Sequence, residues 1–128
     1  SPLIRIPAAR GVGTRVELRC PDPAANPYLV LAACLEAGLD GIRNQITPPD
    51  AVTENVFEMQ LQQRAKLGIE SLPGDLEQAV EELEKDDYIK NVLGGHITEK
   101  YLEAKRAEWA DYRAQVTEWE IEKYLYKI

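Results

Sequence analysis

The stretch GTRVELRCPDPAANPYL, residues 13–29, leads from a strand pattern through a proline-rich turn into the start of a helix. In its first half charged and apolar side chains alternate, which places Arg15, Glu17 and Arg19 on one face of a strand. Asn26 followed by proline is typical of a helix N-terminus. We therefore expect a strand, a rigid turn and a helix in succession.

A second strand pattern precedes this stretch. Leu3–Ile6 predicts the first strand and Thr14–Cys20 the second, and Arg5 points away from the apolar face of the first. Gly11 and Gly13 mark the connection between them. Such glycines suit a plain hairpin loop, and they would also let backbone N–H groups approach a phosphate. The loop lacks the Gly-Lys-Ser/Thr ending of a P-loop, and both interpretations stay open here.

The helix that begins at Pro27 is apolar on almost every side up to about Leu39. A helix without a polar stripe is typically buried, so we expect Cys34 to be a buried small hydrophobe. A chain of 128 residues supplies little protein to surround such a helix. This favours a piece of a longer protein or a subunit interface, and a first residue Ser1 rather than Met agrees with a cut.

The remainder predicts further helices. A short helix is expected near residues 60–66, and Asp75 is placed to cap the next one. The segment DDYIKNVLGG, residues 86–95, predicts a short helix stopped by two glycines, and a long helix starts at about Ile97. The expected apolar stripes are Leu76, Ala79, Val80 and Leu83 after Asp75, and Trp109, Tyr112, Val116 and Trp119 on the last helix. The predicted fold class is α+β, an antiparallel strand pair followed by a mostly helical body.

The composition excludes several classes of protein. Residues 1–20 hold four arginines against one glutamate, a net charge of +3, so the remaining residues carry −10 of the total of −7. An acidic body argues against nucleic-acid binding, and no apolar run approaches the roughly 18 residues of a membrane span. One histidine and two cysteines without a CxxC spacing exclude the usual zinc ligand sets. A local basic patch favours a small anionic ligand, either phosphate or carboxylate.

The Arg15–Glu17–Arg19 row has two interpretations. Antiparallel sheets often keep one face wet, and a charged outer face is the simpler one. In the other, Glu17 binds a hard cation through oxygen while the arginines hold phosphate or carboxylate. One carboxylate does not make a Mg²⁺ site, so further ligands would have to come from outside this chain.

Five segments, in this order, resemble the C-terminal part of type I glutamine synthetase of bacteria and archaea: SPLIRIPA, GTRVELRCPDPAANPYL, AGLDGI, SLPGDLEQAVEELEKD and EAKRAEWADYRAQVTEWE. The resemblance covers essentially the whole chain. It implies that residues 1–128 are the C-terminal portion of the catalytic domain. Residues 1–20 would be a strand pair of the active-site sheet, and residues 21–128 a helical region with a C-terminal strap. The resemblance also implies a homo-oligomer, a dodecamer of two rings in which the strap inserts into the opposite ring, and a cytoplasmic location.

The resemblance also implies an activity, the ATP-dependent ligation of ammonia to L-glutamate through γ-glutamyl phosphate, with two Mg²⁺ or Mn²⁺ ions. By the family motif Glu17 is a metal ligand, Arg5 and Arg15 face the phosphates of ATP, and Arg19 binds glutamate. Arg5 and Arg19 are thereby expected to be catalytic. The other metal ligands and the ammonia site are missing, so the chain alone is predicted to be inactive.

Two rivals remain, a γ-glutamyl-amine (polyamine) ligase of the same fold and a non-catalytic relative kept for structure or regulation. The chain retains Arg5, Arg15, Glu17 and Arg19, which counts against a non-catalytic relative. Two departures from the family pattern concern control and nucleotide contact. Phe57 stands where some members carry an adenylylated tyrosine, and Val12 stands at or near the place of a lysine close to the nucleotide.

Overall fold

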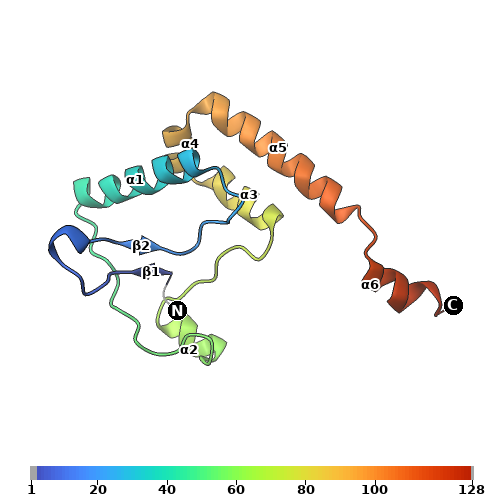
Figure 1. The fold of residues 1–128 in the computed structure, drawn as a ribbon, viewed down its shortest axis with the longest axis horizontal. Helices are drawn as coiled ribbons and strands as arrows, with labels where there is room; N and C mark the ends of the chain where they lie inside the picture. Colours follow the sequence, from blue (N-terminus) through green and yellow to red (C-terminus); the bar gives the residue numbers. More distant parts are fainter. Residues whose placement is uncertain (1–2, 128) are drawn as a thin grey trace. The chain divides into compact units, whose positions relative to one another are not determined.

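The computed structural model describes residues 3–127, which divide after Ser71 into two compact units (Figure 1). The first unit contains β1 (Ile4–Arg5), a 3₁₀ turn (Gly11–Gly13), β2 (Glu17–Leu18), α1 (Pro27–Arg43) and α2 (Leu61–Lys66). The second contains α3 (Leu76–Lys85), α4 (Asp87–Leu93), α5 (Gly95–Arg113), α6 (Glu118–Glu120) and a π-helical turn (Ile121–Leu125). The α+β class is confirmed, with a two-stranded antiparallel sheet and a mostly helical body.

The sheet consists of β1 and β2 in antiparallel register, with Ile4 opposite Leu18 and Arg5 opposite Glu17. Each strand is shorter than the sequence predicts, because pairing stops where Pro7 supplies no backbone N–H. The apolar side of the pair is uncovered, and isolated two-stranded hairpins are marginal. Among the described residues, no third strand pairs with β1 or β2 to lengthen the sheet.

The connection between the strands is a tight turn. The Thr14 backbone N–H donates to the Gly11 carbonyl at 3.1 Å, and Gly11 has a φ of 66°, in the left-handed region. Glycine adopts this conformation without the steric cost that a side chain would impose. The turn itself therefore accounts for Gly11, which favours the hairpin-loop interpretation.

Helix α1 begins where it was predicted. The Asn26 side chain accepts hydrogen bonds from the backbone N–H groups of Tyr28 and Leu29 at 2.9 and 3.3 Å, and Pro27 occupies the first turn. The helix ends at Arg43 rather than near Leu39, because its glycines keep helical backbone angles and do not stop it.

The expected burial of α1 is wrong for this chain. None of its residues is buried, and Cys34 is exposed rather than a buried hydrophobe. Within the first unit, no other described helix or strand packs against α1. Its exposed apolar side chains are Tyr28, Leu31, Leu35 and Ile42. A pattern that is apolar all round requires surrounding protein, and the described residues do not provide it.

The second unit is built by α3, α4 and α5, which pack against one another. Asp75 caps α3 as predicted, accepting a hydrogen bond from the Gln78 backbone N–H at 2.8 Å. Of the expected α3 stripe Val80 is buried, whereas Ala79 is exposed and the two leucines are half-buried. Thr98 of α5 is also buried, and its hydroxyl donates to the Lys90 carbonyl at 3.2 Å.

The two glycines at the end of α4 act differently from the prediction. Gly94 alone stops the helix, with a φ of 79°, and α5 starts directly at Gly95. The last predicted helix is also interrupted, because α5 ends at Arg113. Thr117 starts α6 with a capping box, in which its hydroxyl and backbone pair with Glu120. Val116 and Trp119 therefore do not continue the stripe of α5.

Candidate functional site

Four charged residues of the hairpin form one cluster, here called the arginine–glutamate cluster: Arg5, Arg15, Glu17 and Arg19. Arg5 Nη1 lies 2.9 Å from Glu17 Oε2, and Arg15 Nη2 lies 2.7 Å from Glu17 Oε1. Arg15 Nε also donates to Oε1 at 2.9 Å. Arg19 Nη2 is 3.7 Å from Oε2. The structure thus brings together all four site residues that the sequence predicts.

The backbone explains why these side chains meet. Arg5 stands directly opposite Glu17 in the sheet register, and directly opposed residues have Cβ atoms about 4.5–5.5 Å apart. Arg15 and Arg19 lie two residues before and after Glu17, on the same side of an extended chain. Strand alternation predicts this shared face. It does not predict that Arg15 turns two nitrogens onto a single oxygen of Glu17.

The cluster has an excess of positive charge. Hydrogen bonds from Arg15 and then Arg5 hold the pKa of the Glu17 carboxyl below its ordinary value of 4.5, so it is ionised at neutral pH. Three guanidiniums therefore face one carboxylate. The three arginine side chains are 43–52% exposed and Glu17 is 24% exposed. The cluster is accessible to a ligand, and its surplus charge suits an anion such as phosphate or carboxylate.

Arg10 lies on the same hairpin but outside the cluster. Its Nη1 donates to the backbone carbonyls of Pro7 and Ala9 at 2.8 and 2.9 Å. This arginine braces the turn, and it has the same charge and a similar position in the chain. It is therefore a natural control for the cluster arginines.

A divalent metal fits Glu17 as one ligand of a larger site. Its carboxylate supplies the oxygen donor that Mg²⁺ and Mn²⁺ prefer. Within residues 3–127, no group of three or more His, Cys, Asp or Glu side chains is arranged to hold a metal ion. Further ligands would have to come from protein beyond these residues.

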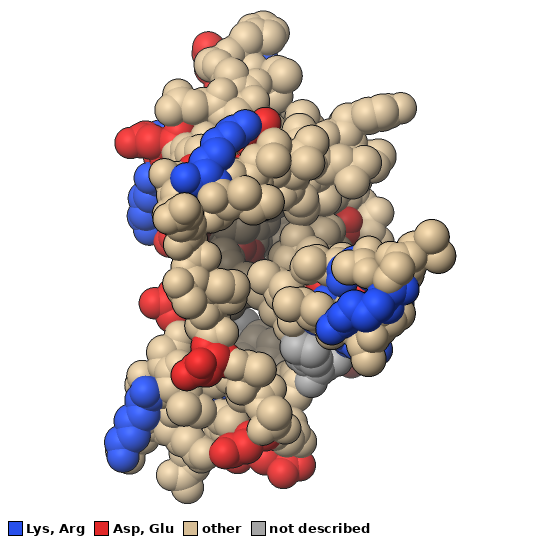
Figure 2. All heavy atoms as spheres, turned by 90° about the vertical axis from the view of Figure 1, so that its left-hand side faces the viewer, with Lys and Arg blue, Asp and Glu red and all other residues tan. Residues whose placement is uncertain are grey.

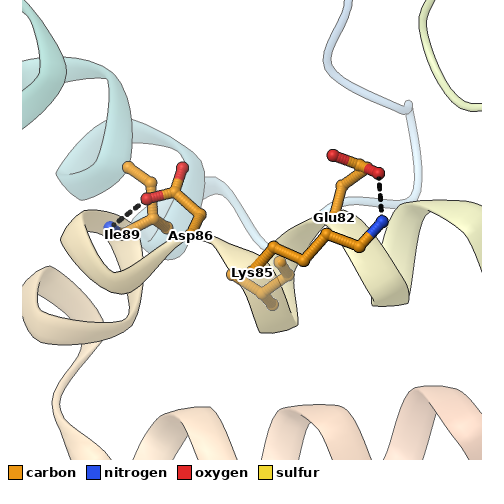
Figure 3. A pocket seen from close by; sticks show the side chains of 5 residues that line it. Glu82, Lys85, Asp86 and Ile89 are labelled. Carbon is orange, nitrogen blue, oxygen red and sulfur yellow. Dashed lines mark hydrogen bonds and ion pairs between the residues drawn. The ribbon is translucent and has the colours of Figure 1, made fainter.

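Two hollows lie among the described residues of the second unit, and their linings serve helix packing. The first is shallow and lies where α3 meets α4 (Figure 3). Its charged groups serve local structure, because Lys85 pairs with Glu82 at 2.8 Å and Asp86 accepts the Ile89 backbone N–H at 3.0 Å. The second lies between α3 and α5, where Arg106 pairs with Glu84. Both are consistent with helix packing.

The surface carries charges of both signs. On the face drawn in Figure 2, acidic and basic side chains are interspersed and separated by neutral surface. Over the described part of the chain, every helix is too short or too polar to cross a lipid bilayer.

Comparison with known proteins decides the family. The family described as "Glutamine synthetase, catalytic domain" matches residues 1–124. The chain belongs to the glutamine synthetase family. The predicted resemblance is thereby confirmed, and the arginine–glutamate cluster lies within the matched catalytic-domain sequence.

Curated relatives agree. The chain is 56% identical to glutamine synthetase of Thermotoga maritima over 126 residues, which are 98% of this chain and 29% of that protein. It is 54% and 53% identical to the glutamine synthetases of Clostridium saccharobutylicum and Methanocaldococcus jannaschii, each over 98% of this chain and 28% of theirs. The chain thus spans less than a third of the length of these glutamine synthetases.

A solved structure has the same fold. The structure described as "Apo GmaS without ligand" matches with a TM-score of 0.78 and 42% sequence identity, over 96% of this chain and 27% of that chain. At this identity and coverage, the arrangement seen here is that of a segment of a larger related protein.

Proposed function

We propose that the protein to which this chain belongs is a glutamine synthetase, which forms L-glutamine from L-glutamate and ammonia with ATP. The observation that carries the proposal is the convergence of three arginines on Glu17 in a chain of this family. Relatives named glutamine synthetase, at 53–56% identity over almost the whole chain, support it.

The proposed reaction has two steps, and both require positive charge near the phosphoryl group. ATP transfers its γ-phosphoryl group to the side-chain carboxylate of glutamate, which gives γ-glutamyl phosphate and ADP. Ammonia then attacks the acyl carbon, forms the C–N bond and expels phosphate, and a proton leaves the nitrogen. Both steps develop charge on phosphoryl oxygens, which preplaced guanidiniums offset.

Each cluster residue has a role in the proposal. Arg5 and Arg15 bind phosphate groups of ATP, since the guanidinium fork matches phosphate geometry. Arg19 binds the glutamate substrate through a carboxylate. Glu17 is a ligand to one of two Mg²⁺ or Mn²⁺ ions. When bound, such an ion neutralises charge on the transferred phosphoryl group. Arg5 and Arg19, which would contact the reacting groups, are the proposed catalytic residues.

We extend the proposal to assembly, location and control. The chain from Asp111 to Lys127 is exposed throughout, which suits a strap that docks in the opposite ring of a dodecamer. It carries four exposed aromatic residues: Tyr112, Trp119, Tyr124 and Tyr126. The enzyme is proposed to be cytoplasmic. Phe57 has no hydroxyl, so adenylylation at this position is not expected. Val12 supplies no charge to a nucleotide.

The test uses the full-length protein. Phosphate release from Mg·ATP and glutamate is measured with and without ammonia, for the wild type and for Glu17→Gln and Arg19→Ala. We expect ammonia-dependent turnover in the wild type and losses of about 100-fold or more in both variants, the scale for removing a preorganised charged group. Arg10→Gln, which removes the same charge outside the cluster, should retain turnover.

Other outcomes identify the rivals. Turnover with a polyamine or another amine, but not with ammonia, would assign a γ-glutamyl-amine ligase. No turnover with any amine would indicate a non-catalytic relative. Turnover that survives both Glu17→Gln and Arg19→Ala would contradict the proposed roles of these residues.

A further inference from the structure

Both oxygens of Glu17 are occupied by guanidinium groups. Oε2 pairs with Arg5 at 2.9 Å, and Oε1 pairs with Arg15 at 2.7 Å. The family role implied for Glu17 needs these same oxygens. The arginines and the metal ion therefore compete for one carboxylate.

Arg15 is the stronger competitor of the two. It covers a single oxygen with both Nη2 and Nε, whereas Arg5 reaches the other oxygen with Nη1. Its remaining Nη1 donates to the Gly13 carbonyl at 3.2 Å, so each guanidinium nitrogen has a partner in this arrangement. The side chain is 52% exposed and lies two residues after the turn, which leaves it space to swing away from Glu17.

A cation bound to Oε1 cannot share that oxygen with two guanidinium N–H groups without strong repulsion. A hydrogen-bonded guanidinium at 2.7 Å occupies the direction of the oxygen lone pairs and carries the same sign of charge as the metal. If Arg15 leaves, its Nε and Nη2 groups lose their carboxylate partner. The best replacement is another oxyanion, and a nucleotide phosphate has the matching geometry.

We propose that Arg15 is an internal counter-cation that occupies Glu17 in the metal-free enzyme and transfers to a nucleotide phosphate when a divalent ion binds Glu17. This inference rests on the proposed function, because it takes the metal and nucleotide roles from it. It adds a coupling, since metal binding releases the arginine that nucleotide binding requires. Metal and nucleotide should therefore strengthen each other's binding through Arg15.

The first experiment measures Mn²⁺ affinity of the full-length, nucleotide-free enzyme by electron paramagnetic resonance. The site in question is the one that Glu17→Gln weakens. We expect Arg15→Gln to bind Mn²⁺ at that site about tenfold more tightly than the wild type, because no charge-assisted hydrogen bonds have to be broken. Arg15→Lys keeps the charge but loses the paired contact, and its affinity should lie between the two.

Arg10→Gln is the matched control. It removes one positive charge from the same hairpin without touching Glu17, so its Mn²⁺ affinity should equal that of the wild type. An equal gain in Arg10→Gln, or wild-type affinity in Arg15→Lys, would overturn the inference, because general charge repulsion would then account for the data. No gain in Arg15→Gln would also overturn it, because Arg15 would then not compete with the metal ion for Glu17. If Glu17→Gln leaves all Mn²⁺ sites unchanged, the metal role in the proposed function fails as well.

A pair of crystal structures gives a readout independent of affinity. In the Mn²⁺-bound, ADP-bound enzyme we expect every guanidinium nitrogen of Arg15 to lie more than 4 Å from Glu17 Oε1 and at least one to contact a phosphate oxygen. In the metal-free enzyme Arg15 should contact Oε1 as it does here. If the Arg15–Glu17 hydrogen bonds persisted beside bound Mn²⁺, the transfer of Arg15 would be excluded. The proposed ligase function would not be contradicted by that result.

Discussion

Arg5 and Glu17 stand directly opposite each other in the antiparallel sheet, and Arg5 Nη1 donates a hydrogen bond to Glu17 Oε2 at 2.9 Å. This cross-strand pair ties the register of the hairpin to the geometry of the site. A slip of one residue would turn Arg15, Glu17 and Arg19 together to the opposite face and would separate them from Arg5. The register of this two-stranded sheet therefore determines whether Arg5 faces Glu17.

The isolated chain is expected to have no ligase activity. Glu17 is the one metal ligand proposed in this chain, and residues 3–127 hold no group of three or more His, Cys, Asp or Glu side chains that could bind a metal ion. Glutamine formation from Mg·ATP, glutamate and ammonia is measured for the purified 128-residue chain, with the full-length protein as the positive control. A clear glutamine yield from the chain alone would contradict this prediction.

Removing the end of the chain after Trp119 should weaken assembly of the full-length protein. The deleted segment includes Tyr124, Leu125 and Tyr126, whose side chains are more than half exposed here and gain burial only against a partner. Analytical ultracentrifugation should then show single rings or smaller species. A shortened protein that stays a stable dodecamer would rule out the strap.

Two adjacent glycines should respond in opposite directions to alanine. Gly94 has a φ of 79°, so Gly94→Ala should destabilise the second unit by about 1–2 kcal/mol. Gly95 is the first residue of α5 and has open space around it, so Gly95→Ala should stabilise by about 0.4–1 kcal/mol. Urea denaturation followed by circular dichroism measures both. Equal effects would mean that backbone conformation does not decide these positions.

Val80 is the buried apolar contact of α3, 7% exposed. Val80→Ala should lower the free energy of unfolding by about 1–2 kcal/mol, since each buried methylene contributes roughly 0.8 kcal/mol. Val116 is 72% exposed in the same unit, and Val116→Ala should change stability by less than about 0.5 kcal/mol. Urea denaturation of both variants checks the contrast, and similar losses would place the core elsewhere.

The capping box of α6 should weaken in acid. Hydrogen bonds from the Thr117 backbone N–H and then the Thr117 hydroxyl lower the pKa of Glu120 below its ordinary 4.5. A lowered folded-state pKa means that this stabilisation is fully present above about pH 4.5 and is lost as the pH falls through the folded value.

Carboxyl carbon chemical shifts of Glu120 in the 128-residue chain provide the measurement. The titration midpoint should lie below 4.5 in the wild type and move up towards 4.5 in Thr117→Ala. A wild-type midpoint at or above 4.5 would show that the box does not persist in solution.

Local signals in the sequence predicted local structure well. Asn26 and Asp75 start their helices because a short polar side chain next to free backbone N–H groups acts within a few residues. Strand alternation likewise placed Arg15, Glu17 and Arg19 on one face. Two helix boundaries were predicted wrongly because of competing local signals. Thr117 caps α6 and interrupts the predicted long helix, and Gly94 ends α4 so that α5 begins at Gly95.

The sequence by itself determined the α+β class, the helix starts, the shared face of the charged row and, through its motifs, the family. Only the tertiary structure decided that Arg5 and Arg15 each occupy one oxygen of Glu17, and that α1 lies uncovered in this chain. Caps and periodicity depend on neighbours a few residues away. Burial and ion pairing depend on which distant surfaces meet, and pattern alone does not specify those surfaces.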